Sequence, residues 1–188
     1  MNDALAEGFD GRLRCWWGVS TPEYVAYHDD EWGRPVRDSH ALYEKLCLEA
    51  FQSGLSWITI LRKREGFRAA FAGFDPAAVA SFGDEDVARL MGDVAIVRNR
   101  AKIEASIVNA RAALTVDLGE LIWSFAPPAR PRPVGRGDVP AVTDESKALA
   151  KDLKKRGFKF VGPTTAYALM QACGLVDDHI EGCCVPAA

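Results

Sequence analysis

Apolar residues at helical spacing run through most of this chain and constrain its fold more than any other feature. Between residues 39 and 52, large apolar side chains recur every three or four positions, which places them on one face of a helix. The same spacing returns further along the chain, in segments 22–31, 57–71, 98–114, 143–156 and 164–173. No segment alternates apolar and polar residues over the length of a strand. The sequence therefore predicts an all-α fold.

Length and charge limit the kind of protein. A chain of 188 residues suits one domain, which we expect over residues 14–188, behind a disordered tail over residues 1–13. That tail lacks the apolar run of a signal peptide, and no stretch approaches the about 18 apolar residues of a membrane helix. We therefore expect a monomeric, cytoplasmic protein without a membrane partner. A net charge of −3 disfavours nucleic acid as a partner, but basic residues cluster at 62–64, 98–102 and 151–159, so charge does not exclude a DNA-binding face.

One stretch combines residues that suit a flat, cationic heterocycle. Glu49 lies at the margin of the apolar stripe predicted for residues 39–52, and the helix ends at the following Ser-Gly pair. Leu55 lies in the turn that follows, and Trp57 begins the next apolar run. In isolation, these residues also fit an ordinary core in which Glu49 pairs with Lys45 one turn back.

A helical hairpin is predicted where the segment 157–163, GFKFVGP, joins two helices. Gly162 lets the backbone turn, and Pro163 can begin a helix because it needs no N–H partner. The first amides of the second helix would then face an anion such as phosphate, flanked by Lys155 and Lys159. An ordinary helical corner with solvated lysines fits the same pattern equally well.

Four candidate metal ligands lie at the two ends of the chain. Cys15 and His28 are near the start, and His179 and Cys183 are one helical turn apart near the end. Closed zinc sites commonly use two cysteines and two histidines, and a site filled by four protein ligands is structural. Buried histidines and thiols without a metal are the alternative. The five cysteines include no CxxC pair, and without a secretion signal they are expected as thiols.

Several segments, taken together, carry a resemblance that none carries alone: 14–15 (RC), 24–33 (YVAYHDDEWG), 48–49 (LE), 52–57 (QSGLSW), 155–162 (KRGFKFVG) and 170–183 (MQACGLV through His179-x3-Cys183). Their order and spacing closely resemble the bacterial 3-methyladenine DNA glycosylase I family, within the helix-hairpin-helix DNA glycosylase superfamily. The resemblance extends from about Arg14 to Cys184.

This resemblance implies a helix-hairpin-helix glycosylase fold in which one structural zinc per chain joins the N- and C-terminal segments. The implied enzyme flips a nucleotide out of double-stranded alkylated DNA, releases free 3-methyladenine by hydrolysis and starts base excision repair. Thr164 stands where lyase members hold a lysine nucleophile, which implies base release without strand cleavage. A non-catalytic, zinc-containing helix-hairpin-helix DNA-binding protein is the alternative. A zinc hydrolase, which needs an open coordination position, is a third.

The resemblance also implies roles for individual residues. The zinc ligands are Cys15, His28, His179 and Cys183. The base pocket is formed by one carboxylate and three aromatic side chains: Glu49, Tyr27, Trp32 and Trp57. DNA contacts fall on the plug that fills the space of the flipped base and on the hairpin: Gln52, Gly54, Leu55, Lys155, Lys159, Gly162 and Thr164. Asp177 resembles the catalytic aspartate of the wider superfamily and is a second catalytic candidate.

Overall fold

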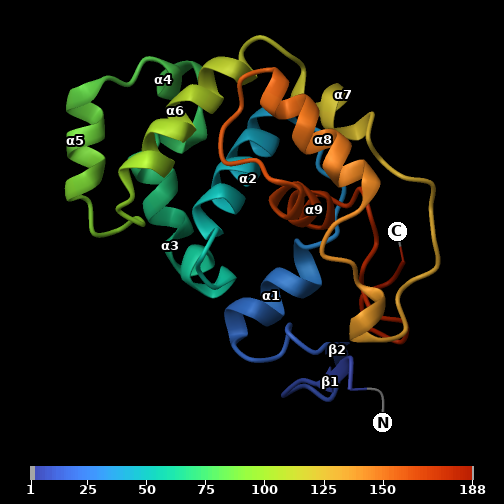
Figure 1. The fold of residues 1–188 in the computed structure, drawn as a ribbon. Coiled ribbons are helices and arrows are strands. Elements are labelled where there is room, and N and C mark those ends of the chain that lie inside the picture. Colours follow the sequence, from blue (N-terminus) through green and yellow to red (C-terminus); the bar gives the residue numbers. More distant parts are fainter. Residues whose placement is uncertain (1–2, 188) are drawn as a thin grey trace.

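The computed structural model describes residues 3–187, and these are mostly helical (Figure 1). The helices are α1 (Pro22–Asp30), α2 (Ser39–Gln52), α3 (Trp57–Ala70), α4 (Pro76–Ala80), α5 (Asp84–Gly92), α6 (Arg100–Ala113), α7 (Leu118–Trp123), α8 (Asp144–Lys155) and α9 (Pro163–Ala172). Two short 3-10 helices are η1 (Ala72–Phe74) and η2 (Arg136–Asp138). The mostly helical prediction is confirmed, with one correction, a small sheet of β1 (Leu5–Glu7) and β2 (Leu13–Cys15).

The small sheet corrects the expectation of a disordered tail over residues 1–13. β1 pairs antiparallel with β2, so that Leu5 faces Cys15 and Glu7 faces Leu13. The hairpin is fixed by Arg14, whose buried guanidinium binds Asp10 at 2.7 Å and Asp29 of α1 at 2.7 Å. These contacts with α1 cannot be seen in local composition, so the polar sequence of the segment does not predict its strands. Residues 1–2 lie outside the described part.

Helix starts follow the sequence closely. Side chains at the residue before the helix accept a hydrogen bond from a first-turn amide at Asp38 for α2, Asn99 for α6 and Thr143 for α8. Such caps satisfy amides that have no partner inside the helix. Asp75 likewise accepts from the Ala77 amide at the start of α4, where Pro76 occupies the first turn.

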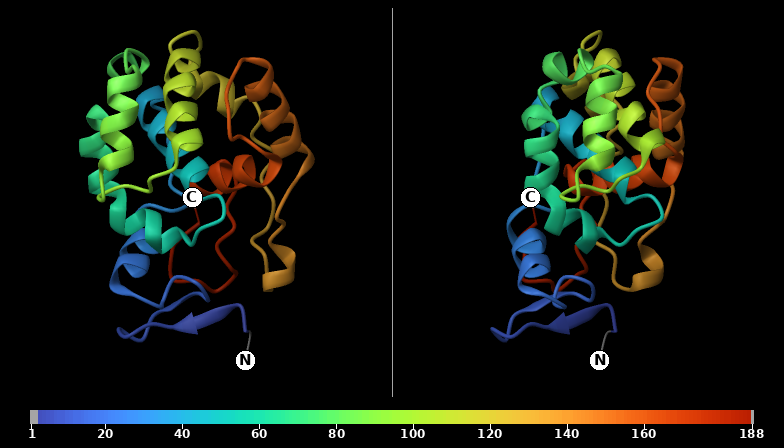
Figure 2. Two further views of the ribbon diagram at one scale, coloured as in Figure 1. Left: turned by 60° about the vertical axis from the view of Figure 1, so that its left-hand side comes forward. Right: turned by 90° about the vertical axis from the view of Figure 1, so that its left-hand side faces the viewer.

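Helix α2 lies at the centre of the helical lobe and packs against α3, α6, α7 and α9. Its apolar face contributes Leu42, Leu46 and Phe51 to one continuous buried cluster. The sheet lies at the other end of the molecule, beyond α1 (Figures 1 and 2). The segment after α9 reaches it, and the Cys184 amide donates to the Leu13 carbonyl oxygen at 2.7 Å. None of the helices in residues 3–187 has the length and apolar character that a membrane span requires.

Candidate base pocket and metal centre

A cavity of about 430 Å³ opens between α1, α2, α3 and α9, and Glu49 of α2 lines it. The Glu49 side chain is buried, with 5% of the residue exposed. The surrounding side chains are chiefly aromatic and come from α1, α3 and the segments near them: Trp16, Trp17, Tyr24, Tyr27, Trp32 and Trp57. The structure thus brings together the four residues predicted for the base pocket, and it adds Trp16, Trp17 and Tyr24.

The aromatic walls are held by contacts among the rings. Tyr27 and Trp57 lie with centroids 5.3 Å apart, and Trp17 meets Trp32 edge-on at 4.9 Å. Aromatic faces attract a cation by about 0.5–2 kcal/mol each. The cavity therefore suits a flat ring, and a positively charged one in particular.

Glu49 has no internal partner in this cavity. Its carboxyl group forms no hydrogen bond or ion pair with any residue in the described range 3–187, and burial raises its pKa to about 8 although Lys45 partly opposes the shift. The Lys45 ammonium binds Glu31 instead, at 2.8 Å, so the predicted alternative of a Glu49–Lys45 pair is wrong. A buried carboxyl group left unpaired is costly, which marks it as a contact for a ligand.

Trp57 repeats this pattern. Its indole Nε1 is shielded from solvent and has no hydrogen-bond partner among the described residues. Buried indole N–H groups usually find an acceptor. Two polar groups without hydrogen-bond partners therefore belong to residues that line the cavity, on the neighbouring helices α2 and α3.

Asp177 was the predicted catalytic aspartate, but its neighbour Asp178 is the one that lines the cavity. Asp178 lines it, and the buried carboxylate accepts hydrogen bonds from Tyr167 Oη at 2.6 Å, Gln171 Nε2 at 2.8 Å and Arg130 Nη2 at 2.5 Å. Asp177 points away and accepts from Arg132 Nε at 2.8 Å. The catalytic role of Asp177 stays a prediction, although Asp178 is the aspartate that lines the cavity.

The proline- and arginine-rich segment 127–140 is bound to this region. Arg130 binds Asp178, and Arg132 binds Asp177. Val139 reaches the cavity itself. The sequence showed a loop without periodicity, and only the fold shows what its arginines bind.

The four predicted metal ligands come together from the two ends of the chain. Their ligand atoms lie within 4.8 Å of one another, and the group could hold a metal ion. Cys183 Sγ is 3.5 Å from His28 Nε2 and 3.7 Å from His179 Nδ1, and Cys15 Sγ is 3.8 Å from His179 Nδ1. Tetrahedral zinc bonds of about 2.3 Å to sulfur and about 2.0–2.1 Å to nitrogen place such atoms about 3.5 Å apart, so the donor set fits.

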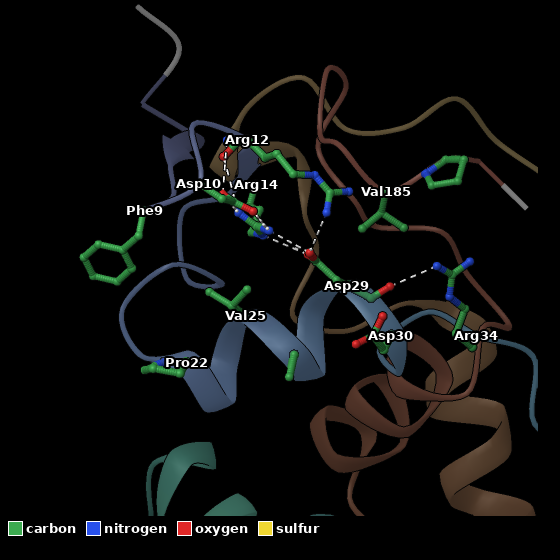
Figure 3. A pocket seen from close by; sticks show the side chains of 12 residues that line it. Phe9, Asp10, Arg12, Arg14, Pro22, Val25, Asp29, Asp30, Arg34 and Val185 are labelled. Carbon is green, nitrogen blue, oxygen red and sulfur yellow. Dashed lines mark hydrogen bonds and ion pairs between the residues drawn. The ribbon is translucent and has the colours of Figure 1, made fainter.

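The remaining ring nitrogens are held by neighbours. His28 Nδ1 lies 2.8 Å from an Asp29 carboxylate oxygen, and His179 Nε2 lies 3.2 Å from the Trp32 carbonyl oxygen. Such contacts fix the tautomer that leaves the other nitrogen free for a metal. Figure 3 shows Asp29 also bound by Arg12, Arg14 and the Arg34 side chain, the last through the Asp29 backbone carbonyl.

A larger groove of about 630 Å³ is lined by Val25 and Asp29 of α1 (Figure 3). The base cavity is lined by Tyr24 and Tyr27 of the same helix. None of the predicted site residues lines the larger groove. Its charged residues Asp10, Arg14 and Asp29 bind one another rather than facing the groove unpaired. Its size alone does not make it the functional site.

The predicted DNA contacts occupy two separate surface elements. Gln52 lines the cavity, and the turn after it carries Gly54, whose φ of +82° favours glycine, and Leu55, which is 41% exposed. Lys155, Lys159 and Thr164 are exposed at the hairpin.

Gly162 does not make the turn of the hairpin, contrary to its predicted role. It precedes α9 with φ −84° and ψ 168°, which any residue adopts, while Gly157 at φ +95° and Phe160 at φ +55° reverse the chain. No side chain caps α9, and a Cβ at Gly162 would meet no atom within 4 Å. The first amides of α9 are therefore left uncovered.

A helical hairpin whose second helix, α9, lines an aromatic cavity with the buried carboxyl groups of Glu49 and Asp178 agrees with the resemblance to helix-hairpin-helix DNA glycosylases. The profile of the methyladenine glycosylase family matches residues 17–186. The chain is 51% identical to DNA-3-methyladenine glycosylase 1 of Escherichia coli K12 over 178 residues, covering 91% of this chain and 95% of that protein. The chain belongs to the methyladenine glycosylase family.

Two further relatives agree in extent. DNA-3-methyladenine glycosylase of Haemophilus influenzae is 48% identical over 178 residues, covering 90% of this chain and 96% of that protein. A solved structure on 3-methyladenine recognition by 3-methyladenine DNA glycosylase I of Staphylococcus aureus superposes with a TM-score of 0.87 at 38% identity, covering 91% of this chain and 95% of that one.

Proposed function

We propose that this protein is a monofunctional DNA-3-methyladenine glycosylase, which releases 3-methyladenine from double-stranded alkylated DNA. The observation that carries the proposal is the Glu49 carboxyl group, buried and unpaired inside an aromatic cavity. The relatives named above supply the reaction and the base. The enzyme acts as a monomer in the bacterial cytoplasm, where its substrate lies.

Recognition begins when the damaged nucleotide leaves the duplex. Flipping costs a few kcal/mol, and the cost is smaller for a damaged base. Leu55 enters the stack from the exposed turn after α2, and Gln52 fills the space at the mouth of the cavity. The uncovered amides of α9 bind a backbone phosphate, with Lys155 and Lys159 adding positive charge. Binding thus depends on two elements on either side of the flipped nucleotide.

Charge then selects the lesion. An N3-alkylated adenine in DNA is a cation, which Tyr27 and Trp57 favour over a neutral base. Glu49 is largely protonated at neutral pH in the empty cavity, since its pKa is raised to about 8. A cation beside it favours the carboxylate form, so base and carboxylate stabilise each other. Ordinary adenine gains neither contribution.

Release needs little acid catalysis, because alkylation already weakens the glycosidic bond. Water attacks the sugar, and the oxocarbenium-like transition state is favoured by the negative charge of Glu49 and Asp178 at the cavity. Thr164 offers no amine nucleophile in the hairpin. The product is therefore an abasic site in an intact strand.

The metal group is proposed as a structural zinc site, one per chain. Cys15, His28, His179 and Cys183 would fill all four positions and tie the two ends of the chain together. A filled coordination sphere leaves no position for substrate, so this zinc would stabilise the fold and supply no step of the reaction.

The proposal is tested by incubating the protein with methylated duplex DNA and identifying the released bases by chromatography. We expect 3-methyladenine to be released, and to be released much more slowly by Glu49→Gln. A non-catalytic DNA-binding protein would release no base. A borohydride-trapped covalent adduct with DNA would contradict the absence of lyase chemistry.

A further inference from the structure

Helix α6 carries two buried polar side chains that the proposed reaction does not use. Lys102 is 7% exposed and Asn109 is fully buried. They lie seven positions apart, so they fall within roughly 20° of one line along the helix. Each of them holds the backbone of an element proposed to touch DNA.

Lys102 holds the turn that carries Leu55. Its Nζ donates hydrogen bonds to the carbonyl oxygens of Phe51 at 2.8 Å and Ser53 at 2.6 Å, at the C-terminal end of α2. Gly54 and Leu55 follow directly. A cation is favourable at the C-terminus of a helix, where the last carbonyls have no helical partner.

Burying the Lys102 ammonium group at the end of α2 costs desolvation free energy. No carboxylate pairs with Lys102 anywhere in residues 3–187, and burial lowers its pKa. An apolar residue of similar volume would fill the same space without desolvating a charge. We infer from this desolvation cost that Lys102 serves to position the turn with Gly54 and Leu55, and not only to stabilise the fold.

Asn109 holds the hairpin in a comparable way. Its Nδ2 donates to the Lys159 carbonyl oxygen at 3.1 Å, and its Oδ1 accepts from the Lys159 amide at 2.7 Å. Both polar groups of one hairpin residue are thus bound by a single side chain. Phe160, in the left-handed region with φ +55°, follows immediately.

We propose that α6 is a spacer that sets the position of the plug turn relative to the hairpin, with Lys102 and Asn109 as its two positioning residues. Seven residues of helix separate the two attachment points by about 10.5 Å along the axis. Figure 2 shows α6 with the α2–α3 turn near its N-terminal end and the α8–α9 connection alongside it. A plug and a phosphate site must engage one duplex together, and a misplacement of about 1 Å can cost about a hundredfold in rate. The inference rests on the proposed roles of Leu55 and the hairpin.

The experiment measures affinity for a duplex that contains a tetrahydrofuran abasic site, alongside affinity for free 3-methyladenine. Lys102→Met should weaken duplex binding about tenfold, the usual effect of losing a hydrogen bond from a charged group, and leave free-base binding unchanged. Lys102→Arg keeps donors at this place and should restore most of the affinity. Asn109→Leu should weaken duplex binding in the same selective way.

A double-mutant cycle separates positioning from general stability. If Lys102 acts through the plug, Lys102→Met should add little to the loss already caused by Leu55→Ala. Additive losses, or an equal loss of free-base binding, overturn the inference while Leu55 keeps its role. If Leu55→Ala itself leaves duplex affinity unchanged, the plug is wrong and the spacer with it. Should Lys102→Met not fold, Lys102→Gln removes the charge and keeps a donor for the same cycle.

Discussion

The candidate metal centre, formed by Cys15, His28, His179 and Cys183, and the candidate base cavity around Glu49 are both buried polar sites, yet key polar atoms in them are partnered in opposite ways. At the metal centre, His28 and His179 each have one nitrogen bound to a neighbour and the other near the cysteine sulfurs. In the cavity, Glu49 has no hydrogen bond among the described residues, and Trp57 Nε1 has none either. Partners supplied by the chain itself indicate a site built for stability. Their absence indicates a site that a ligand completes.

The two sites share a wall. Trp32 meets His179 edge-on at 4.7 Å and also meets Trp17 at 4.9 Å, and Trp17 lies 5.2 Å from His28. Both tryptophans line the cavity. A change in the position of His28 or His179 is therefore expected to shift Trp17 and Trp32 in the wall of the cavity.

The largest effect is expected from removing a metal ligand. Cys183→Ala should lose the zinc and lower the free energy of unfolding by more than about 4 kcal/mol, because metal binding is part of folding. The neighbouring Cys184→Ala is the matched control, since Cys184 lies outside the ligand group. Metal content and denaturant unfolding measure both variants. A Cys183→Ala protein as stable as the control would show that metal binding by the cluster does not stabilise the fold.

The next effect concerns the pH dependence of stability. Folding raises the pKa of Glu49 from 4.5 to about 8 by burial, so the folded state binds more protons between these values. The contribution of Glu49 to stability is then full below about pH 4.5 and is lost as the pH rises through about 8. Glu49→Gln lacks this loss and should exceed wild type by more than about 2 kcal/mol at pH 8, with little difference at pH 4.5. If wild type and Glu49→Gln give parallel curves of unfolding free energy against pH, the pKa of Glu49 is not raised by folding.

A smaller effect separates the adjacent aspartates. Asp178→Asn leaves one of three donors facing an amide N–H₂ group, and we expect a loss of about 1–3 kcal/mol in stability or excision. Asp177→Asn removes only the ion pair with Arg132 and should leave excision nearly unchanged. Excision rates on methylated DNA compare the two directly. If Asp177→Asn lowers the excision rate more than Asp178→Asn does, Asp177 and not Asp178 is the aspartate that assists the reaction.

The smallest effect is expected at the hairpin. Lys155→Gln should weaken DNA binding about equally across sequences and lower the slope of log affinity against log salt by about one unit. Lys151→Gln, on the same helix but further from α9, is the comparison. An unchanged slope would leave the hairpin as a structural corner.

Local patterns predicted the helices, and with them the position of Glu49. Periodicity predicted α2, and Pro163 predicted the start of α9, although Gly157 and Phe160 rather than Gly162 reverse the chain before it. The three-residue strands escaped prediction, because Arg14 stabilises them through contacts with α1. Asp178 escaped because adjacent loop residues have no periodicity, and distant arginines decide which of them faces inward.

The buried polar residues of α6 escaped for a related reason. Lys102 and Asn109 look like solvated positions in the sequence, since lysine and asparagine are mostly exposed in proteins. Their partners are backbone groups of segments about 50 residues away in the chain. Such contacts exist only once the helices have packed.

The most direct test of the unpaired carboxyl is a calorimetric titration of free 3-methyladenine into wild type, Glu49→Gln and Leu55→Ala. One lost charge-assisted hydrogen bond is worth roughly 1.5–3 kcal/mol, so Glu49→Gln should bind about ten- to a hundredfold more weakly than wild type. Leu55→Ala should match wild type, because Leu55 is exposed on the turn proposed to contact DNA and does not line the cavity. Equal affinity for wild type and Glu49→Gln would contradict a base-binding role for this carboxyl group.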